Sequence, residues 1–157
     1  MLVEEDGDHR DPRWELRASF FVPGIPKPQG SKRAFVNPKT NRAVVVEDNT
    51  KTHDWRSDVR AMAYDYSDSR ISDGPVRLEL EFVMRRPVST PKTKPTPHAV
   101  KKPDLDKLVR AILDALTGIL FSDDSQVTGI TAHKRIAEVD EMPGCRIVML
   151  GAPEHTA

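Results

Sequence analysis

The stretch from Lys101 to Gln126, KKPDLDKLVRAILDALTGILFSDDSQ, constrains the fold more than any other part of the chain. Pro103 and Asp104 suit the start of a helix, where an aspartate side chain can accept hydrogen bonds from free N–H groups. Gly118 suits a left-handed exit. Apolar residues recur between them at helical spacing, and these are Leu105, Leu108, Val109, Ile112 and Leu116. The stretch therefore predicts one helix with a buried stripe.

Both ends of the predicted helix carry acids. Asp104 and Asp106 lie at its start, and Asp123 and Asp124 follow its end. Each of them has a structural interpretation when taken singly, because aspartates cap helices and form turns. Together they favour a bound divalent cation, since one cap is enough for a helix and like charges held close repel each other.

Basic residues surround these acids. Asp106, Arg110 and Asp114 follow one another at steps of four, so they share a helix face with alternating charge. Five cations lie within or just before the helix, and these are Lys94, Lys101, Lys102, Lys107 and Arg110. Carboxylates beside basic side chains are typical of a site in which a metal ion binds a phosphate group.

Three motifs resemble a known family. PDLDK (103–107), DALTG (114–118) and DDSQV (123–127), in this order and spacing, resemble the RusA family of Holliday junction resolvases of bacteria, prophages and phages. The resemblance covers most of the chain after residue 13 and favours a phage or prophage origin. It implies an endonuclease that uses Mg²⁺, with Mn²⁺ as a substitute, and acts as a homodimer on branched DNA, especially four-way junctions. It assigns metal binding to Asp104, Asp106 and Asp124, with Asp123 beside them.

One position departs from the family pattern. The family's functional lysine, four positions after the second aspartate of the DLD motif, corresponds here to Arg110. Arginine keeps the positive charge and can hold two phosphate oxygens, but it does not lose a proton at ordinary pH. We therefore expect Arg110 to stabilise the transition state and not to shuttle protons. Lys107 is a nearby alternative.

The resemblance implies hydrolysis of a phosphodiester bond, with 5′-phosphate and 3′-hydroxyl products. It gives catalytic roles to Asp104, Asp106, Asp124 and Arg110. Two other classes stay open. One is a branched-DNA-binding protein without catalysis, whose carboxylates are structural caps. The other is a small domain whose aspartates bind Ca²⁺ for stability, although the chain lacks the spaced D-x-[DN]-x-[DN]-G loop of such sites.

Charge is unevenly distributed along a chain whose formal net charge is zero. Residues 84–110 carry eight bases and two acids, a net of +6, and residues 27–51 carry six bases and two acids, a net of +4. Such regions beside an acidic site favour contact with a phosphate backbone, although a solvated surface explains scattered lysines equally well. The predicted DNA-binding residues are Lys27, Lys32, Arg33, Lys94, Lys101, Lys102, Lys107 and Lys134. Aromatic residues make up 6%, so base stacking on a single strand has little support.

The rest of the pattern predicts an α+β fold, a mixed β-sheet packed with two main α-helices. Strands are expected at 14–22, with Trp14, Leu16 and Phe20 on the buried face, and at 76–84 after Gly74. Residues 34–37 and 43–46 should form a hairpin. A helix should follow and end near residue 67, with Arg56 and Arg60 on its outer side. Residues 125–136 and 145–150 should be strands joined through a turn at 142–144.

The domain limits follow from composition. Residues 1–13, with five acids and two bases, predict a flexible acidic tail, residues 14–150 an endonuclease domain, and residues 151–157 a short C-terminal tail. The proline-rich segment 86–103 predicts a mobile arm that closes over substrate. Cys145 is alone in an apolar run, so a buried thiol is expected. Without a signal peptide or an apolar run near eighteen residues, we expect a soluble, cytoplasmic protein.

Overall fold

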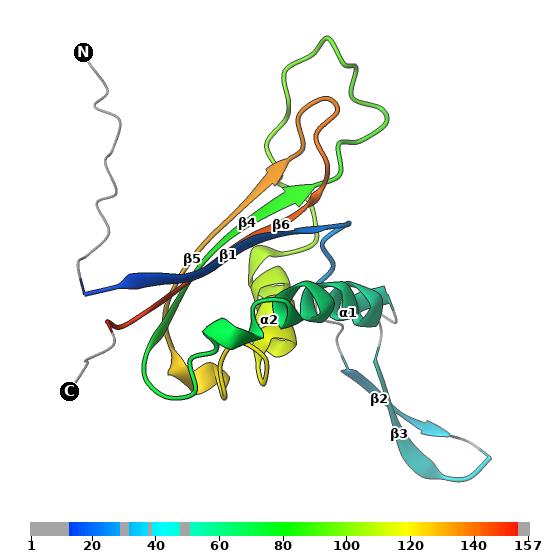
Figure 1. Cartoon of the computed structure of the whole chain (residues 1–157). Helices are drawn as coiled ribbons and strands as arrows, with labels where there is room; N and C mark the ends of the chain where they lie inside the picture. Colours follow the sequence, from blue (N-terminus) through cyan, green and yellow to red (C-terminus); the bar gives the residue numbers. More distant parts are fainter. Residues whose placement is uncertain (1–12, 29–31, 38, 48–50, 154–157) are drawn as a thin grey trace.

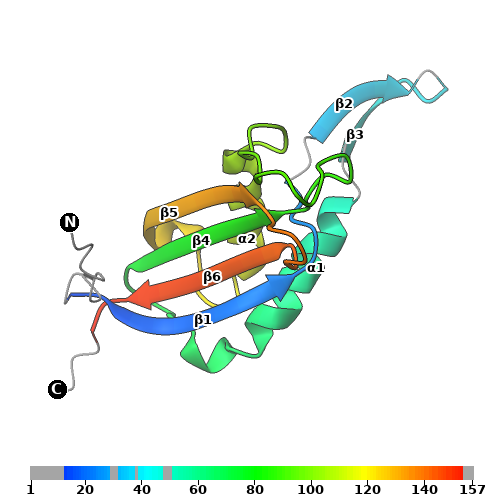
Figure 2. The same ribbon diagram turned by 90° about the horizontal axis from the view of Figure 1, so that it is seen from above.

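The computed structural model describes residues 13–28, 32–37, 39–47 and 51–153. Its centre is a four-stranded sheet with the strand order β1-β6-β4-β5. These strands are β1 (Glu15–Pro23), β4 (Val76–Met84), β5 (Val127–Ile136) and β6 (Gly144–Gly151). Helices α1 (Lys51–Tyr64) and α2 (Leu105–Leu116) cover one face of the sheet, as Figure 1 and Figure 2 show. The predicted α+β class, with a mixed sheet and two main helices, is confirmed.

Helix α2 connects two parallel strands. β4 runs antiparallel to β6 and parallel to β5, with Val76 opposite Val127 and Met84 opposite Ile136. Parallel neighbours need a crossover connection, and here it consists of a proline-rich segment, α2 and the loop after α2. The start of α2 therefore lies near the ends of β4 and β5, and its end lies near their beginnings.

The core forms between the sheet and the helices. Alternate residues of β4, from Val76 to Phe82, are at most 2% exposed, because one face of the strand meets the helices. Helix α2 contributes a fully buried stripe of Leu108, Ala111, Ile112, Ala115 and Leu116. Of the predicted stripe, Leu108, Ile112 and Leu116 are fully buried, whereas Leu105 and Val109 are half-buried against the core. Full burial of each large side chain stabilises the fold by roughly 1.5–3 kcal/mol.

Two predictions for β1 are wrong. Ala18, Phe20 and Val22 face the core as expected, but Leu16 is 54% exposed, and Trp14 is half-buried against the guanidinium of Arg77 and is not part of the core. The register between β1 and β6 shifts between Leu16 and Ala18. An irregularity of this kind breaks the alternation of faces, so the residue before it leaves the buried row.

The prediction that Arg56 and Arg60 lie on the outer side of α1 holds only in part, because Arg60 is exposed whereas Arg56 is half-buried. Nη1 of Arg60 donates to the carbonyl oxygen of Ala115 at 3.1 Å, and Nη1 of Arg56 lies 3.7 Å from Oδ2 of Asp114. Both partners belong to α2. Because α1 packs beside α2, the two arginines connect the helices, and contact with DNA is not needed to explain them.

The two C-terminal strands were predicted correctly, but their connection differs from a simple hairpin. β4 lies between β5 and β6. The link, residues 137–143, passes the end of β4, where the main-chain N–H of Ala137 donates to the carbonyl oxygen of Met84 at 2.8 Å. Alternation in the sequence gives the strands but not the order in which they pair, so this position of β4 was not predicted.

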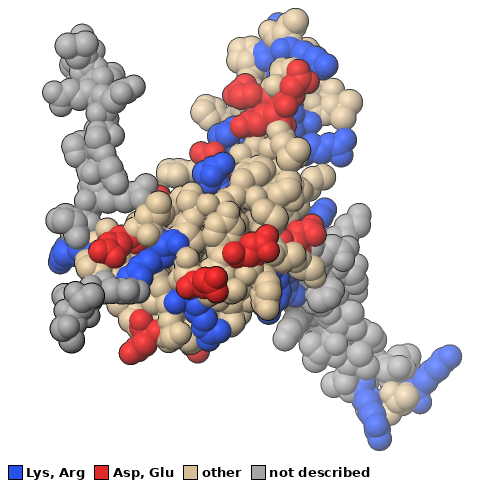
Figure 3. Space-filling view, viewed as in Figure 1, with Lys and Arg blue, Asp and Glu red and all other residues tan. Residues whose placement is uncertain are grey.

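The predicted hairpin is present as β2 (Lys32–Asn37) and β3 (Arg42–Glu47), an antiparallel pair in a sheet of its own. It projects away from the central sheet in both ribbon views (Figure 1, Figure 2). Its tip, residues 39–42, is exposed, and Figure 3 shows basic side chains at its end.

The acidic tail predicted at 1–13 lies outside the described residues up to residue 12. Among the described residues, no helix is long and apolar enough to cross a bilayer.

The proline-rich segment 86–103, here called the arm, extends beyond the sheet beside residues 137–143 (Figure 1). Arg86 ties it together, because Nη1 donates to Oγ1 of Thr96 at 2.6 Å and Nη2 donates to the carbonyls of Pro91 and Lys94 at 3.1 and 3.0 Å. Oγ1 of Thr96 in turn donates to Oε2 of Glu138 at 2.6 Å. The sequence predicted a mobile arm, whereas the structure shows an internally bonded one. Closure over substrate stays a prediction.

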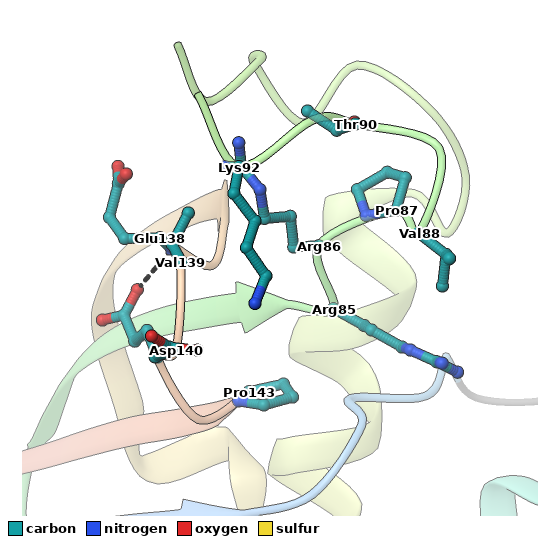
Figure 4. Close-up of a pocket in the computed structure, with 11 residues that line it drawn as sticks. Arg85, Arg86, Pro87, Val88, Thr90, Lys92, Glu138, Val139, Asp140 and Pro143 are labelled. Carbon is teal, nitrogen blue, oxygen red and sulfur yellow. Dashed lines mark hydrogen bonds between the residues drawn. The ribbon is translucent and has the colours of Figure 1, made fainter. Parts of the chain in front are cut away.

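A hollow of about 320 Å³ lies between the arm and the turn formed by residues 137–143 (Figure 4). Lys92 extends from the arm toward the turn, which carries Glu138 and Asp140. Figure 3 shows a red cluster with blue side chains around it on the part of the molecule that extends beyond the sheet. The arm and the turn therefore face each other with opposite charge.

Candidate active site

The start of α2 presents two carboxylates. Asp104 is the N-cap residue, with φ −68° and ψ 142°, but its side chain makes no capping hydrogen bond, contrary to the prediction. Its main-chain oxygen instead accepts from the N–H of Leu108 at 3.2 Å. Asp106 occupies the second helical position, as predicted. Both residues are exposed, and within the described ranges neither carboxylate has a hydrogen-bond or ion-pair partner.

The loop after α2 returns toward the helix. A helix of twelve residues is about 18 Å long, so acids before and after it are far apart unless the chain folds back. Gly118 has φ +86°, which suits glycine, and the fully buried Leu120 and Phe121 fix the loop in the core. The main-chain N–H of Ile71 donates to the carbonyl of Leu120 at 2.9 Å. The loop is thus anchored just before Asp124.

Asp123 and Asp124 have different surroundings. Oδ1 of Asp123 accepts from the main-chain N–H of Ser125 at 2.8 Å, and Oε1 of Gln126 accepts from the N–H of Asp123 at 2.9 Å. This is a capping box at the start of η2 (Asp124–Gln126). The pKa of Asp123 lies below its usual value, first because of the Ser125 N–H and then because of the side chains of Ser125 and Asp124. Asp123 therefore has a structural role, and Asp124 is the member of the pair that faces the site.

Asp106 and Asp124 line one hollow of about 410 Å³, here called the site hollow. It lies along the exposed side of α2, and its other lining residues are Lys107, Val109, Arg110, Leu113 and Asp114. The sequence predicted that carboxylates from both ends of the helix meet, and the fold brings these two to the same hollow together with Arg110.

Asp104 lies elsewhere. It lines a neighbouring hollow of about 460 Å³ with Lys27, Lys102 and Lys107, so Lys107 borders both hollows. No three metal-ligating side chains lie close enough to hold one ion in the part of the chain that the structure describes. The predicted group of Asp104, Asp106 and Asp124 is therefore not formed as a unit. The reason is local, because residues two apart at a helix start do not face the same way.

The charges in the site hollow are largely uncompensated by protein. Asp114 forms an ion pair with Arg56, but no described residue forms an ion pair with Asp106, Arg110 or Asp124. Exposed carboxylate oxygens are the ligands that Mg²⁺ prefers, and Mg²⁺ keeps several waters when a site offers few carboxylates. A guanidinium group suits phosphate oxygens. By the chemistry of their side chains, the residues present fit a hydrated Mg²⁺ beside a phosphate.

The predicted DNA-binding residues divide into five groups. Lys27, Lys102 and Lys107 line the Asp104 hollow, and Lys101 lines another hollow of about 490 Å³ beneath the arm. Lys94 is exposed on the arm. The side chains of Lys32 and Arg33, in β2, lie outside the description. Lys134 differs from the rest, because its Nζ donates to the main-chain oxygens of Lys101 and Pro103, both at 2.9 Å.

Sequence reasoning missed Gln126 and Arg70. Nε2 of Gln126 donates to the carbonyls of Ile71 and Gly74 at 3.0 and 3.1 Å. Nη1 of Arg70 donates to the carbonyl of Gly118 at 2.8 Å. These three bonds tie the loop after α2 to residues 70–74. The D-x-x-Q spacing of Asp123 and Gln126 was a detectable signal, since it is a capping-box pattern.

The comparisons with known proteins agree with this geometry. The family described as endodeoxyribonuclease RusA matches residues 23–148. The chain belongs to the RusA family. The match includes both aspartate motifs and the whole of α2. The uncharacterized protein YqaN of Bacillus subtilis (strain 168) is 28% identical over 127 residues, which cover 76% of this chain and 87% of that protein. Membership of the RusA family implies an endodeoxyribonuclease, and the predicted family is confirmed. A phage origin stays a prediction.

Proposed function

We propose that this RusA-family chain is a Mg²⁺-dependent endonuclease that resolves four-way junctions and related branched DNA by paired nicks. The observation that supports the proposal most directly is the site hollow, where Asp106, Asp124 and Arg110 have no ion-pair partner among the described residues. Carboxylates for a cation and a guanidinium for phosphate thus meet on an accessible surface. Mn²⁺ is expected to substitute for Mg²⁺.

Each residue has a defined role in the proposal. Asp106 and Asp124 hold the ion, and Asp104 contributes from the adjoining hollow, with Asp123 fixing the start of η2. When bound, Mg²⁺ supplies Lewis-acid stabilisation of the departing 3′ oxygen and makes water a better nucleophile. Arg110 hydrogen-bonds the non-bridging phosphate oxygens, where negative charge grows. The products are a 5′-phosphate and a 3′-hydroxyl.

The basic residues around the two hollows give the DNA a path to the site. Lys102 and Lys107 border the Asp104 hollow, and Lys101, near the end of the arm, lines the hollow of about 490 Å³. None of the three side chains has a hydrogen-bond or ion-pair partner in the described structure. Free ammonium groups bind phosphates and release counterions, so binding should weaken steeply with salt.

A homodimer completes the proposal. A four-way junction has approximate two-fold symmetry, so a two-fold dimer presents one site to each of two strands. Light scattering of the purified protein should give twice the chain mass of 17.6 kDa. A monomer that still makes paired nicks would remove the dimer from the mechanism without affecting the metal site.

The decisive experiment compares a labelled mobile four-way junction with a linear duplex of the same sequence. With Mg²⁺ or Mn²⁺ the junction should be nicked in pairs and the duplex should stay intact, whereas Ca²⁺ should permit binding but little cleavage. Salt-sensitive junction binding without nicking under any metal would instead support a non-catalytic branched-DNA-binding protein. A metal-dependent rise in melting temperature without DNA affinity would support a structural cation.

A further inference from the structure

Strand β5 has a polar side chain near each end that is bonded to the segments carrying the site aspartates. Gln126 directly precedes its first residue, and Lys134 lies two residues before its last. Both side chains are partly buried. Both donate hydrogen bonds to main-chain oxygens of other segments, and neither lines the site hollow.

Lys134 occupies a position where the strand pattern calls for an apolar residue. It is in register with Phe82, which is fully buried on the face that the helices cover. Its neighbours on that face, Ala132 and Ile136, pack against the core. The Lys134 ammonium reaches the main-chain oxygens of Lys101 and Pro103, which immediately precede Asp104. Charge-assisted bonds of this kind are about twice as strong as neutral ones.

Gln126 uses both ends of its amide. Oε1 accepts from the N–H groups of Ser122 and Asp123 at 2.8 and 2.9 Å. Nε2 donates to the carbonyls of Ile71 and Gly74 at 3.0 and 3.1 Å. Its two donors and two acceptor positions are all satisfied. The side chain thus fixes the two residues before Asp124 to a segment on the other side of the loop.

We infer that Lys134 and Gln126 are positioning residues, which set the main chains of Asp104 and Asp124 relative to each other. The inference rests on the proposed metal site. β5 is paired with β4 from Val127 to Ile136, so it forms a stiff connection between the two ends of α2. Misplacement of a ligand-bearing segment by about 1 Å is enough to impair a site of this type.

The inference gives Lys134 a different role from the DNA contact that its charge predicts. A phosphate-binding lysine contributes about one unit to the dependence of log affinity on log salt. A lysine whose ammonium is engaged with two carbonyls contributes nothing to that slope. The partners of a metal ligand affect metal affinity instead, typically by about 10–100-fold.

The experiment uses the full chain with K134M, K134R, Q126E and the charge-matched control R146M. Arg146 lies on the sheet face away from the helices, with its guanidinium 5.7 Å from the centre of the Phe21 ring. Electron paramagnetic resonance of Mn²⁺ measures metal affinity without DNA. Junction binding in Ca²⁺ at several salt concentrations gives the slope, and Mg²⁺ titration of cleavage gives the concentration for half-maximal rate.

K134M should weaken Mn²⁺ binding about 10-fold or more and raise the Mg²⁺ requirement for cleavage, with the salt slope of the parent. K134R should recover part of the affinity, because a guanidinium also donates to two carbonyls. Q126E keeps the two acceptors and loses the two donors, so it should show a smaller loss. R146M should behave like the parent in all three measurements.

Two results would overturn the inference while leaving the proposed function in place. One is parental Mn²⁺ affinity in both K134M and Q126E. The other is a salt slope lowered by about one unit in K134M, which would make Lys134 a DNA contact. If K134M melts well below the parent without metal, weaker Mn²⁺ binding would also follow from loss of the fold. K134R then decides between the two causes, because it retains metal affinity only if its guanidinium restores the bonds to the two carbonyls. If the parent protein neither binds Mn²⁺ nor cuts junctions, the proposed function is wrong, and so is the inference that rests on it.

Discussion

The arm with its turn and the site hollow are both rich in charge, but they use it differently. In the first region Arg86 bonds to the arm, and Nη1 of Arg135 lies 2.6 Å from Oε1 of Glu141. In the site hollow, Asp106, Arg110 and Asp124 have no ion-pair partner among the described residues. Charges that meet inside the protein stabilise its shape, whereas charges left facing solvent are available to a ligand.

The electrostatics of the paired region agree with this view. The hydrogen bonds from Arg135 are the largest reason why the pKa of Glu141 falls to about 2, and the same bonds, which Glu141 accepts, are the largest reason why the pKa of Arg135 is raised. Both groups therefore stay ionised over the whole physiological range. The comparison predicts that substitutions in the site hollow change activity with little effect on stability, and that substitutions in the arm and turn do the reverse.

The largest effect is expected from the carboxylates of the site hollow. D106N and D124N should each lower the junction cleavage rate roughly 1,000-fold or more, since loss of a single oriented group in an enzyme site already costs about 100–1,000-fold. Junction binding should survive or tighten, because a negative charge facing phosphate is removed. Single-turnover cleavage and a gel-shift titration measure the two quantities. Near-parental cleavage by either variant would show that the site is wrongly assigned.

Substitution of Arg110 tests the role of the positive charge in the site hollow. R110A should lower the cleavage rate about 100-fold, because the group that binds the phosphate oxygens in the transition state is lost. R110K should recover a large part of the rate, since the charge remains at the position where the family has lysine. Melting temperatures of both variants should match the parent, because no described residue pairs with Arg110. A large loss of stability in R110A would break the comparison.

Arg86 tests the paired region. R86A removes three hydrogen bonds that hold the arm, so the free energy of unfolding should fall by about 1–2 kcal/mol. Hydrogen exchange should rise at residues 91–96, and proteases should cut the arm sooner. Cleavage of a junction should fall much less than in D124N. If arm exchange stays at the parental rate, the bonds from Arg86 are not what orders the arm.

The smallest effect concerns the pH dependence of stability. A carboxyl group whose folded pKa is lowered contributes stability above its unfolded pKa and loses it as pH falls through the folded value. The stability that ionised Glu141 contributes is therefore lost as the pH falls from 4.5 to about 2. Because the side chains of Arg135 and Glu141 are 40% and 33% exposed, the pair contributes about 0.2–1 kcal/mol. E141Q should melt slightly below the parent at neutral pH, and the two curves should converge toward pH 2.

Patterns of a few residues were enough to predict most of the elements. The alternation from Val76 to Met84 gave β4, and the stripe along Leu105 to Leu116 gave α2, because burial on one face imposes a period on the sequence. Asp106 was placed correctly at the second helical position for the same reason. The capping hydrogen bond expected of the Asp104 side chain is absent, since a residue type permits a cap without enforcing one.

The set of elements, the family and the residues available for chemistry could therefore be predicted from the order of amino acids. How these elements meet depends on tertiary contacts. The tertiary structure placed β4 between β5 and β6, turned Arg56 toward α2, and brought Asp124 but not Asp104 into the hollow of Asp106. It also engaged the charge of Lys134 inside the protein. The reason is that periodicity records which face of an element is buried, whereas contacts between elements depend on strand order and on loops that follow no period.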